Sequence, residues 1–302
     1  MLATVLTGQQ VLNMLTDAAT LFVLASGLGV IFGLMNVINF AQGAFIAIGA
    51  YIASLLTQHA VSPWLLIPAG VAIGAGCGLV VELAFIRRLY TRPWDTILAT
   101  IGLQLVIVAA LSLIFGLGNR YVGSPLKGQI DLGFTTYSSY RIFIVGVAVA
   151  LGLLWVATER FTRLGLIARA VMAHETLAST LGIDTRVVRR VTFVIGCGLA
   201  GLGGATVAPI TAVQPNMGDQ YLVSAFLIVL VAGNSVSGLA LASLILGGLE
   251  SWVTFLTSPI VGNIAIIVLA AAILRLVPGG LQQLTAPSWA AIRRPRPRLG
   301  GG

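Results

Sequence analysis

Two polar interruptions in otherwise apolar segments hold the residues best suited to bind a solute. Residues 33–43 (GLMNVINFAQG) place two asparagines and a glutamine between glycines, and residues 233–238 (GNSVSG) form a similar break in the second half of the chain. Side-chain amides donate and accept hydrogen bonds without carrying a charge. They therefore suit a zwitterion or a neutral polar solute as easily as an anion.

Other kinds of site chemistry find no support in the sequence. The motifs HExxH, GxSxG and GxxxxGK[ST], which mark zinc proteases, serine hydrolases and phosphate-binding loops, do not occur. His59 and His174 fall in expected loops, and Cys77 and Cys197 lie alone inside apolar segments. We therefore expect no catalytic residue, no metal site and no cofactor, and we interpret both cysteines as small core residues.

The elements that must position the two polar breaks are membrane helices. The chain has 302 residues, of which 58% are hydrophobic and 9% charged, and its mean hydropathy is +1.01. Runs such as 96–116 carry no charge over the roughly 20 residues that a helix needs to cross a bilayer core. Backbone groups there must be satisfied within the helix. We predict an all-α polytopic membrane protein with broken helices and nine spans, near residues 14–35, 41–57, 64–86, 96–116, 141–158, 191–213, 221–237, 239–256 and 260–277.

The basic residues predict how these helices are oriented. Of the 17, none precedes Arg87, and alternation through nine spans puts fourteen on one side and three on the other, the three being Arg120, Lys127 and Arg141. Cytoplasmic loops carry such an excess, so we expect the N-terminus outside and the C-terminus in the cytoplasm. The net charge of +8 then reflects span-flanking residues near anionic lipids, and no nucleic acid is expected. The absence of Lys and Arg near Met1 argues against a cleavable signal peptide.

The polar groups inside these spans indicate a pathway without energy-coupling machinery of its own. Carriers coupled to protons or sodium usually keep ionisable groups near mid-membrane, and only Asp17 and Glu250 are candidates for that depth. We expect Asp17 to be solvated near the outer surface. Glu250 fits either a structural acid or a substrate contact. The two polar breaks, at corresponding places in two halves, indicate a substrate site between discontinuous helices, although each also fits a turn between helices.

The longest expected cytoplasmic segment, residues 159–190, contains an amphipathic helix. Its apolar side chains recur at steps of three and four, and they include Ile167, Ala170, Val171, His174, Leu177, Ala178 and Leu181. Gly182 follows as a left-handed helix stop. Such a helix fits the lipid headgroup surface or the groove of a cytoplasmic partner.

Three stretches resemble permeases of the branched-chain amino acid ABC importer family. MNVINFAQGAFIAIGAYIA is similar to that family's INFAHG-type signature, and RAVMAHETLASTLGIDTRVV followed by TFVIGCGLAGLGGA resembles its cytoplasmic loop and next span. VAGNSVSGLALASLILGGLES resembles its glycine-rich segment, which usually reads more like GGLGSxxG. The similarity covers roughly residues 10–280, and the motifs occur in the family's order.

The resemblance implies a multi-pass permease subunit of the bacterial inner membrane without an ATP site. It implies as partners two cytoplasmic ATPases, a second permease subunit that is identical or different, and a periplasmic substrate-binding protein. The expected organisation is a single permease domain over 1–280, with its coupling loop at 159–190, and a basic cytoplasmic tail over 281–302.

The resemblance also implies roles for residues of the three motifs. The expected substrate path includes Asn36, Asn39, Phe40, Gln42, Gly43, Gly233, Asn234 and Ser235. The expected ATPase-coupling residues are Arg169, His174, Glu175, Leu177, Leu181, Gly182 and Ile183.

Two departures from the family pattern bear on the substrate. Gln42 stands where the family usually has histidine, so a role for a titratable imidazole is lost, and the GNSVSG segment replaces a more glycine-rich turn. A branched-chain or other amino acid is the expected solute. Sister branches that carry urea, short amides or organic acids are an alternative, and so is a stand-alone channel for small neutral solutes. A membrane-embedded enzyme is disfavoured because the sequence has no catalytic cluster.

Overall fold

A computed structural model of the protein describes residues 8–35, 38–59, 61–89, 92–126, 128–131, 136–233, 235–277 and 279–281. Its helices are α1 (Gly8–Met35), α2 (Gln42–Gln58), α3 (Leu66–Ala84), α4 (Pro93–Phe115), α5 (Ser139–Phe161), α6 (Arg163–Ala173), α7 (Glu175–Thr180), α8 (Thr185–Val207), α9 (Asp219–Ala232), α10 (Val236–Leu256) and α11 (Pro259–Leu276). Short 3₁₀ turns, η1 (Pro63–Leu65) and η2 (Ile86–Arg88), flank α3. The strands β1 (Gln129–Asp131) and β2 (Thr136–Ser138) form one antiparallel hairpin.

The predicted all-α membrane architecture is confirmed. Among the described residues, seven helices are long and apolar enough to cross a membrane, and α2 and α9 are shorter apolar helices. These nine helices coincide with the nine predicted segments to within six residues at either end. The largest differences are at α1 and at α8, which starts at Thr185 instead of residue 191. The number of complete crossings and the orientation of the termini stay predictions.

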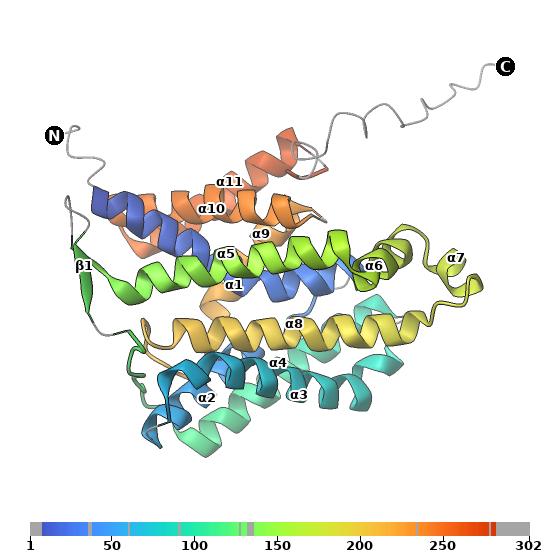
Figure 1. The fold of residues 1–302 in the computed structure, drawn as a ribbon, viewed down its shortest axis with the longest axis horizontal. Helices are drawn as coiled ribbons and strands as arrows, with labels where there is room; N and C mark the ends of the chain where they lie inside the picture. Colours follow the sequence, from blue (N-terminus) through green and yellow to red (C-terminus); the bar gives the residue numbers. More distant parts are fainter. Residues whose placement is uncertain are drawn as a thin grey trace.

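The apolar helices run along the long axis of the molecule (Figure 1). The β1–β2 hairpin and the start of α1 lie at one end, which we call the hairpin end, and α6 and α7 lie at the other, the loop-helix end. Tyr137 of β2 ties the hairpin to α1, because its hydroxyl donates to Asn13 Oδ1 at 2.9 Å and lies 3.0 Å from the Thr16 hydroxyl. The charge distribution predicts that the hairpin end faces the periplasm.

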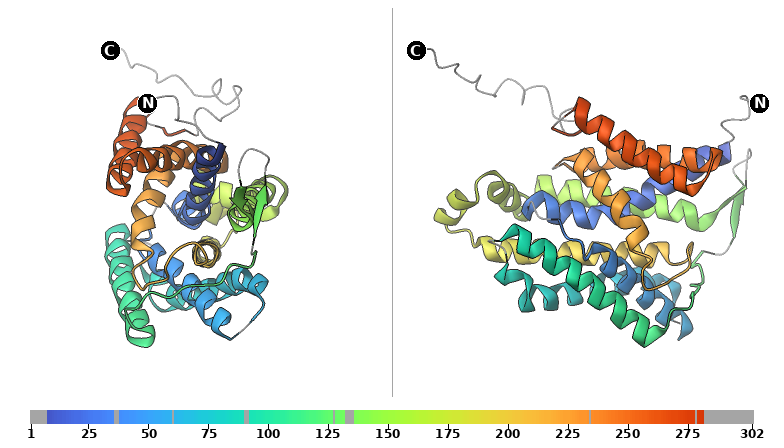
Figure 2. Two further views of the ribbon diagram at one scale, coloured as in Figure 1. Left: turned by 90° about the vertical axis from the view of Figure 1, so that its left-hand side faces the viewer. Right: turned by 180° about the vertical axis from the view of Figure 1, so that it is seen from behind.

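Helix α8 lies at the centre of the bundle, between α1 and the group formed by α2, α3 and α4 (Figure 2, left). Glycines allow its backbone to approach its neighbours closely. A Cβ atom at Gly49 of α2 or at Gly204 of α8 would overlap a backbone carbonyl, that of Gly201 and that of Ile46 respectively. In the membrane, where lipid tails are as apolar as side chains, such close packing is a main source of helix association.

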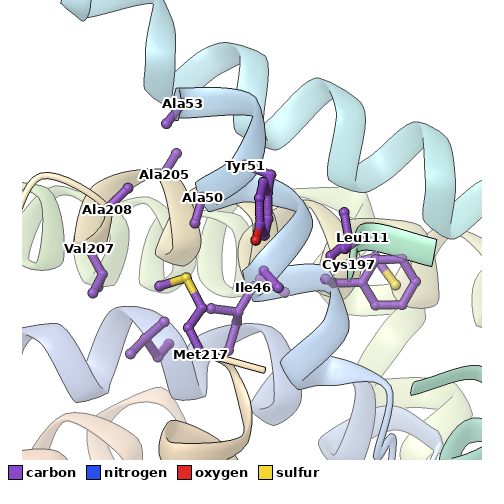
Figure 3. Packing of buried hydrophobic residues seen from close by; sticks show 14 of the residues in the cluster. Ile46, Ala50, Tyr51, Ala53, Leu111, Cys197, Ala205, Val207, Ala208 and Met217 are labelled. Atoms are coloured by element: carbon purple, nitrogen blue, oxygen red, sulfur yellow. The ribbon is translucent and has the colours of Figure 1, made fainter. Parts of the chain in front are cut away.

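Two buried clusters hold the helices together, and α1 contributes to both. One joins α2, α3, α4 and α8, and it includes Ala50, Tyr51 and Cys197 (Figure 3). Cys197 is buried and Cys77 packs against the same cluster, as expected for small core residues. The other cluster joins α5, α9, α10 and α11 to the opposite side of α1. Helix α1 is therefore the boundary between two packed halves.

We expect the α3–α8 contact to be intolerant of one added methyl group. A Cβ at Gly74 would lie 2.7 Å from the Cys197 carbonyl oxygen, whereas a Cβ at Gly76 in the same helix would meet nothing within 4 Å. Gly74→Ala should therefore destabilise the protein by about 1–3 kcal/mol through overpacking. Gly76→Ala should be neutral or stabilise by up to about 1 kcal/mol. Thermal unfolding of the purified protein in detergent measures both, and equal midpoints for the two variants would contradict this account of the contact.

Candidate substrate path and ATPase-docking helix

The first polar break is a tight turn between α1 and α2, and side chains of α4 help to hold it. Asn36 lies outside the described residues. Asn39 Oδ1 accepts a hydrogen bond from the Ala41 N–H at 3.1 Å, and the Phe40 N–H donates to Thr100 Oγ1 at 3.3 Å. The turn ends where α2 begins, at Gln42.

Gln104, near the middle of α4, joins this turn to the start of α9. Its Oε1 accepts from the Ala44 N–H at 2.6 Å, and its Nε2 donates to Asp219 Oδ1 at 2.5 Å. Gly43 and Gly218 lie in backbone contact, and a Cβ at Gly218 would overlap the Gly43 carbonyl. The first residues of α2 and of α9 therefore meet at one point, which we call the junction (residues 39–44, Gln104, Gly218 and Asp219).

The two helices that begin at the junction are the shortest of the nine apolar helices. Helix α9 has 14 residues and α2 has 17, which correspond to about 21 and 25 Å against roughly 30 Å of hydrocarbon. Non-helical backbone at such depth is tolerated only where protein or a water-filled cavity covers it. Discontinuous helices that meet inside the membrane are the arrangement found at substrate sites of transporters.

The junction contains buried amide groups without protein partners. Asn39 is 1% exposed and Gln42 is fully buried. Within the described part of the chain, Asn39 Nδ2 and both amide atoms of Gln42 accept or donate no hydrogen bond. The Gln42 amide nitrogen lies against Gly27 of α1, where an added Cβ would be 2.5 Å from it. Each unpaired buried group costs about 1–3 kcal/mol, so these amides are suited to bind a polar solute or water.

The second polar break is a turn at the other end of α9. Gly233 ends α9 with φ 73°, and the Ser235 hydroxyl caps α10 by accepting from the Gly238 N–H at 3.0 Å. Asn234 lies outside the described residues. The structure therefore does not bring the two breaks together, because the length of α9, about 21 Å, separates them. The segment that packs against the first break is the start of α9. In the sequence, only Pro215 and Gly218 mark the turn that precedes this helix.

The loop 159–190 is shorter than predicted, and its expected single helix is two helices. Helix α5 continues to Phe161 and α8 begins at Thr185. His174 adopts an extended conformation (φ −156°, ψ 93°) that separates α6 from α7. The predicted apolar stripe is thus divided, with Ile167, Ala170 and Val171 on α6 and Leu177 and Ala178 on α7. Arg169 also lies on α6. The continuous spacing of apolar residues concealed this break because the direction of the chain changes at one residue.

Two leucines are exposed at α7, one within the helix and one directly after it. Leu177 and Leu181 are 59% and 75% exposed, whereas Ala178 is 2% exposed and packs inward. Gly182 has φ 86°, which confirms the left-handed stop. The Gly182 N–H donates to the Ser179 carbonyl and the Ile183 N–H to the Ala178 carbonyl, both at 3.1 Å, which is the Schellman arrangement.

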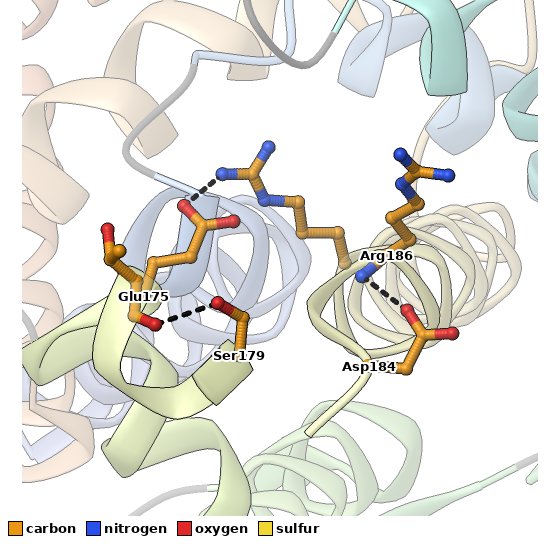
Figure 4. A network of polar contacts seen from close by, with 6 residues as sticks. Glu175, Ser179, Asp184 and Arg186 are labelled. Carbon is orange, nitrogen blue, oxygen red and sulfur yellow. Dashed lines mark hydrogen bonds and ion pairs between the residues drawn. The ribbon is translucent and has the colours of Figure 1, made fainter. Parts of the chain in front are cut away.

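Ion pairs on α8 hold α7 and α3. Arg189 bonds to Glu175 at the start of α7, and Asp184 caps the start of α8 by accepting from the Arg186 N–H at 3.0 Å (Figure 4). The next residue, Arg190, pairs at 3.0 Å with Glu82 of α3, whose side chain is 1% exposed. Two consecutive residues of α8, Arg189 and Arg190, thus connect α7 and α3 through this helix.

The fold and these two regions define a class of protein. Apolar helices around a junction of short helices, with an exposed capped helix at one end, are the features of a membrane permease driven by a partner. Among the described residues, no group of three or more His, Cys, Asp and Glu lies close enough to hold a metal.

Comparison with known proteins gives the family. The model of the family described as branched-chain amino acid transport system / permease component matches residues 10–281. The chain belongs to this family, and it is a multi-pass inner-membrane permease subunit of an ATP-binding-cassette importer. The family implies ATPase and substrate-binding partners.

The relatives are similar over most of their length. The probable branched-chain amino acid transport permease protein LivH of Methanocaldococcus jannaschii is 27% identical and aligned over 91% of each chain. LivH of Salmonella typhimurium is 27% identical over 90% of this chain and 94% of its own. BraD of Pseudomonas aeruginosa is 27% identical over 81% and 85%. A solved structure, PsaBC from Streptococcus pneumoniae in complex with Fab, gives a TM-score of 0.48 at 15% identity, with 91% and 95% of the two chains covered.

We expect Leu177→Asp to uncouple ATP hydrolysis from transport while membrane insertion is retained. A carboxylate buried in an apolar groove costs several kcal/mol, and each 1.4 kcal/mol or so weakens docking about tenfold. Leu177→Met, which keeps an apolar side chain, is the control. Solute uptake and ATP turnover in proteoliposomes, with membrane fractionation for insertion, measure the effect. Wild-type uptake by Leu177→Asp would show that α7 is not the docking helix.

Proposed function

We propose that this chain carries a branched-chain amino acid across the inner membrane as one of two permease subunits. Two ATPases dock on the loop helices of the pair, and a periplasmic binding protein delivers the solute. The observation that carries the proposal is the exposed, glycine-capped helix α7 with Leu177 and Leu181, held to α8 by Glu175 and Arg189. The names of the relatives support the choice of solute.

The docking helix also favours this function over a stand-alone channel. A passive pore has no need for an exposed apolar helix tied by an ion pair to the central helix of the bundle. The coupling residues would be Arg169 on α6, His174 at the break, Glu175, Leu177 and Leu181 on and after α7, and Gly182 and Ile183 in the cap. A permease of the same family for urea or short amides remains the second candidate, because Asn39 and Gln42 offer neutral amides to such a solute.

The purified chain alone is expected to hydrolyse no ATP. It has no phosphate-binding loop, and turnover should arise only when ATPase subunits are bound, with stimulation by the loaded binding protein. The measurement is phosphate release by the chain alone, by the ATPases alone and by the complex. Solute-stimulated turnover limited to the complex supports the proposal. ATP hydrolysis by the single chain would refute it.

The junction is proposed to open as the path during the ATPase cycle. In a background that carries Cys77→Ala and Cys197→Ala, Gln42→Cys should react slowly with a small soluble thiol reagent in one ATPase state and severalfold faster in another. Ser54→Cys is the control, because Ser54 lies on the same helix, is 1% exposed and is remote from the junction. Labelling rates with and without ATP and vanadate provide the measurement. If Gln42→Cys stays inert in every state, the path lies elsewhere, and Asn234 becomes the next position to test.

A further inference from the structure

A polar cavity of about 540 Å³ lies between α1, α9, α10 and α11, in the half of the bundle nearer the hairpin. Its volume falls within the roughly 300–1,000 Å³ typical of small-molecule sites. Gln10 and Asn13 of α1 and Asn263 of α11 are among the lining residues, and Gln220 contributes from α9. None of these residues was expected from the sequence to belong to the substrate path.

The cavity brings together the two acidic residues that the sequence places at depth. Asp17 and Glu250 both line it. Asp17 lies more than two turns into α1, and its Oδ2 accepts a hydrogen bond from the Ser251 hydroxyl at 2.6 Å. The two carboxylates therefore contribute negative charge to the same cavity. Asp17 is an exposed residue, as expected for a solvated acid, and the structure adds that its surroundings are this cavity.

One basic residue, Arg141 at the start of α5, belongs to the same cavity lining. Its Nη1 donates to Asn13 Oδ1 at 2.7 Å. A guanidinium has five N–H donors, so this contact leaves donors for a ligand carboxylate. With two carboxylates against one guanidinium, the cavity favours a ligand that carries an ammonium group.

Two atoms of the lining are enclosed but unpaired. Glu250 Oε2 and Trp252 Nε1 are buried, and within the described residues neither has a protein hydrogen-bond partner. One is an acceptor and the other a donor, so a ligand with both kinds of group can satisfy them. Polar atoms withdrawn from water in this way are costly unless a ligand or water bonds to them, and ionisable groups at membrane depth most often serve transport.

We propose that this cavity is the site where the permease first holds its solute, and that the ligand is a zwitterionic α-amino acid. The ammonium group lies against Asp17 and Glu250, the carboxylate faces Arg141, and Met14 and Phe255 of the lining contact the apolar side chain. Urea would leave the three charges unpaired, and an anion would meet a net negative lining. This inference rests on the proposed function as a permease for an amino acid, and it adds the residues that hold the charged groups of that solute.

The cavity is separated from the junction by the first turn of α9. Gln220 and Tyr221 line the cavity, and the preceding residues, Gly218 and Asp219, contact Gly43 and Gln104 in the junction. A solute in the cavity thus lies one helical turn from the closed path. Entry requires the start of α9 to shift, which would break the hydrogen bond between Gln104 and Asp219.

The first test is leucine uptake by the complete transporter in proteoliposomes. Glu250→Gln and Asp17→Asn together should lower uptake at least tenfold, because the ammonium group of the solute loses both carboxylates. Asp95→Asn, an acid on α4 that does not line the cavity, is the matched control and should keep wild-type uptake. Wild-type uptake by the double variant would overturn the inference. If the wild-type complex transports urea but no leucine, the proposed function itself fails, and that result is separate from any result on the variants.

A second measurement leaves the charged residues intact, in case the double variant does not assemble. Ser251→Cys, in the background with Cys77→Ala and Cys197→Ala, places a thiol beside Asp17 in the assembled complex. Leucine at 10 mM, roughly a saturating excess over a weak site with a Kd near 1 mM, should slow labelling by a small thiol reagent at least fivefold. Urea and 4-methylpentanoate, which lacks the ammonium group, should not. Equal labelling with and without leucine, or equal protection by all three, would overturn the assignment.

Discussion

The structure depends on backbone contact between α8 and the helices around it. Three glycines of α8 allow the backbones of α1, α2 and α3 to lie directly against its own, and these are Gly196, Gly201 and Gly204. Such contacts are rigid, because any added atom overlaps a carbonyl. The Gln42 amide lies beside Gly27, the glycine of α1 that meets the Gly196 carbonyl of α8. The junction is therefore held by the same packing that assembles the bundle.

Helix α9 connects the two candidate regions of the path. Its first residue bonds to Gln104 in the junction, its next residues line the polar cavity, and its last residue precedes the turn at Gly233. It is also the shortest of the apolar helices, with 14 residues. The hydrogen bond to Gln104 and the backbone contact between Gly218 and Gly43 hold its start against the junction. Helix α9 is therefore the structural link between the junction and the polar cavity.

The sequence predicted the architecture because its signals are local. Uncharged runs and clustered arginines identify membrane helices one by one, and Gly182 marked its helix end correctly. The junction and the cavity depend on which helices meet, which no local pattern contains. Asn39 and Gln42 were identified as polar, but their neighbour Gln104 sits in an apolar run and gave no signal. Asp17 and Glu250 were each noticed, and only the fold shows that they share a cavity.

Two ion pairs at the loop-helix end of α8, those of Arg189 and Arg190, join this helix to α7 and to α3. Two and three turns further on, Gly196 contacts α1 and Gly201 contacts α2 and α3. The ion pair with buried Glu82 is costly to break, and close glycine contacts join α8 to α3. Helix α8 therefore ties the exposed helix α7 to the bundle in which the unpaired amides of Asn39 and Gln42 are enclosed.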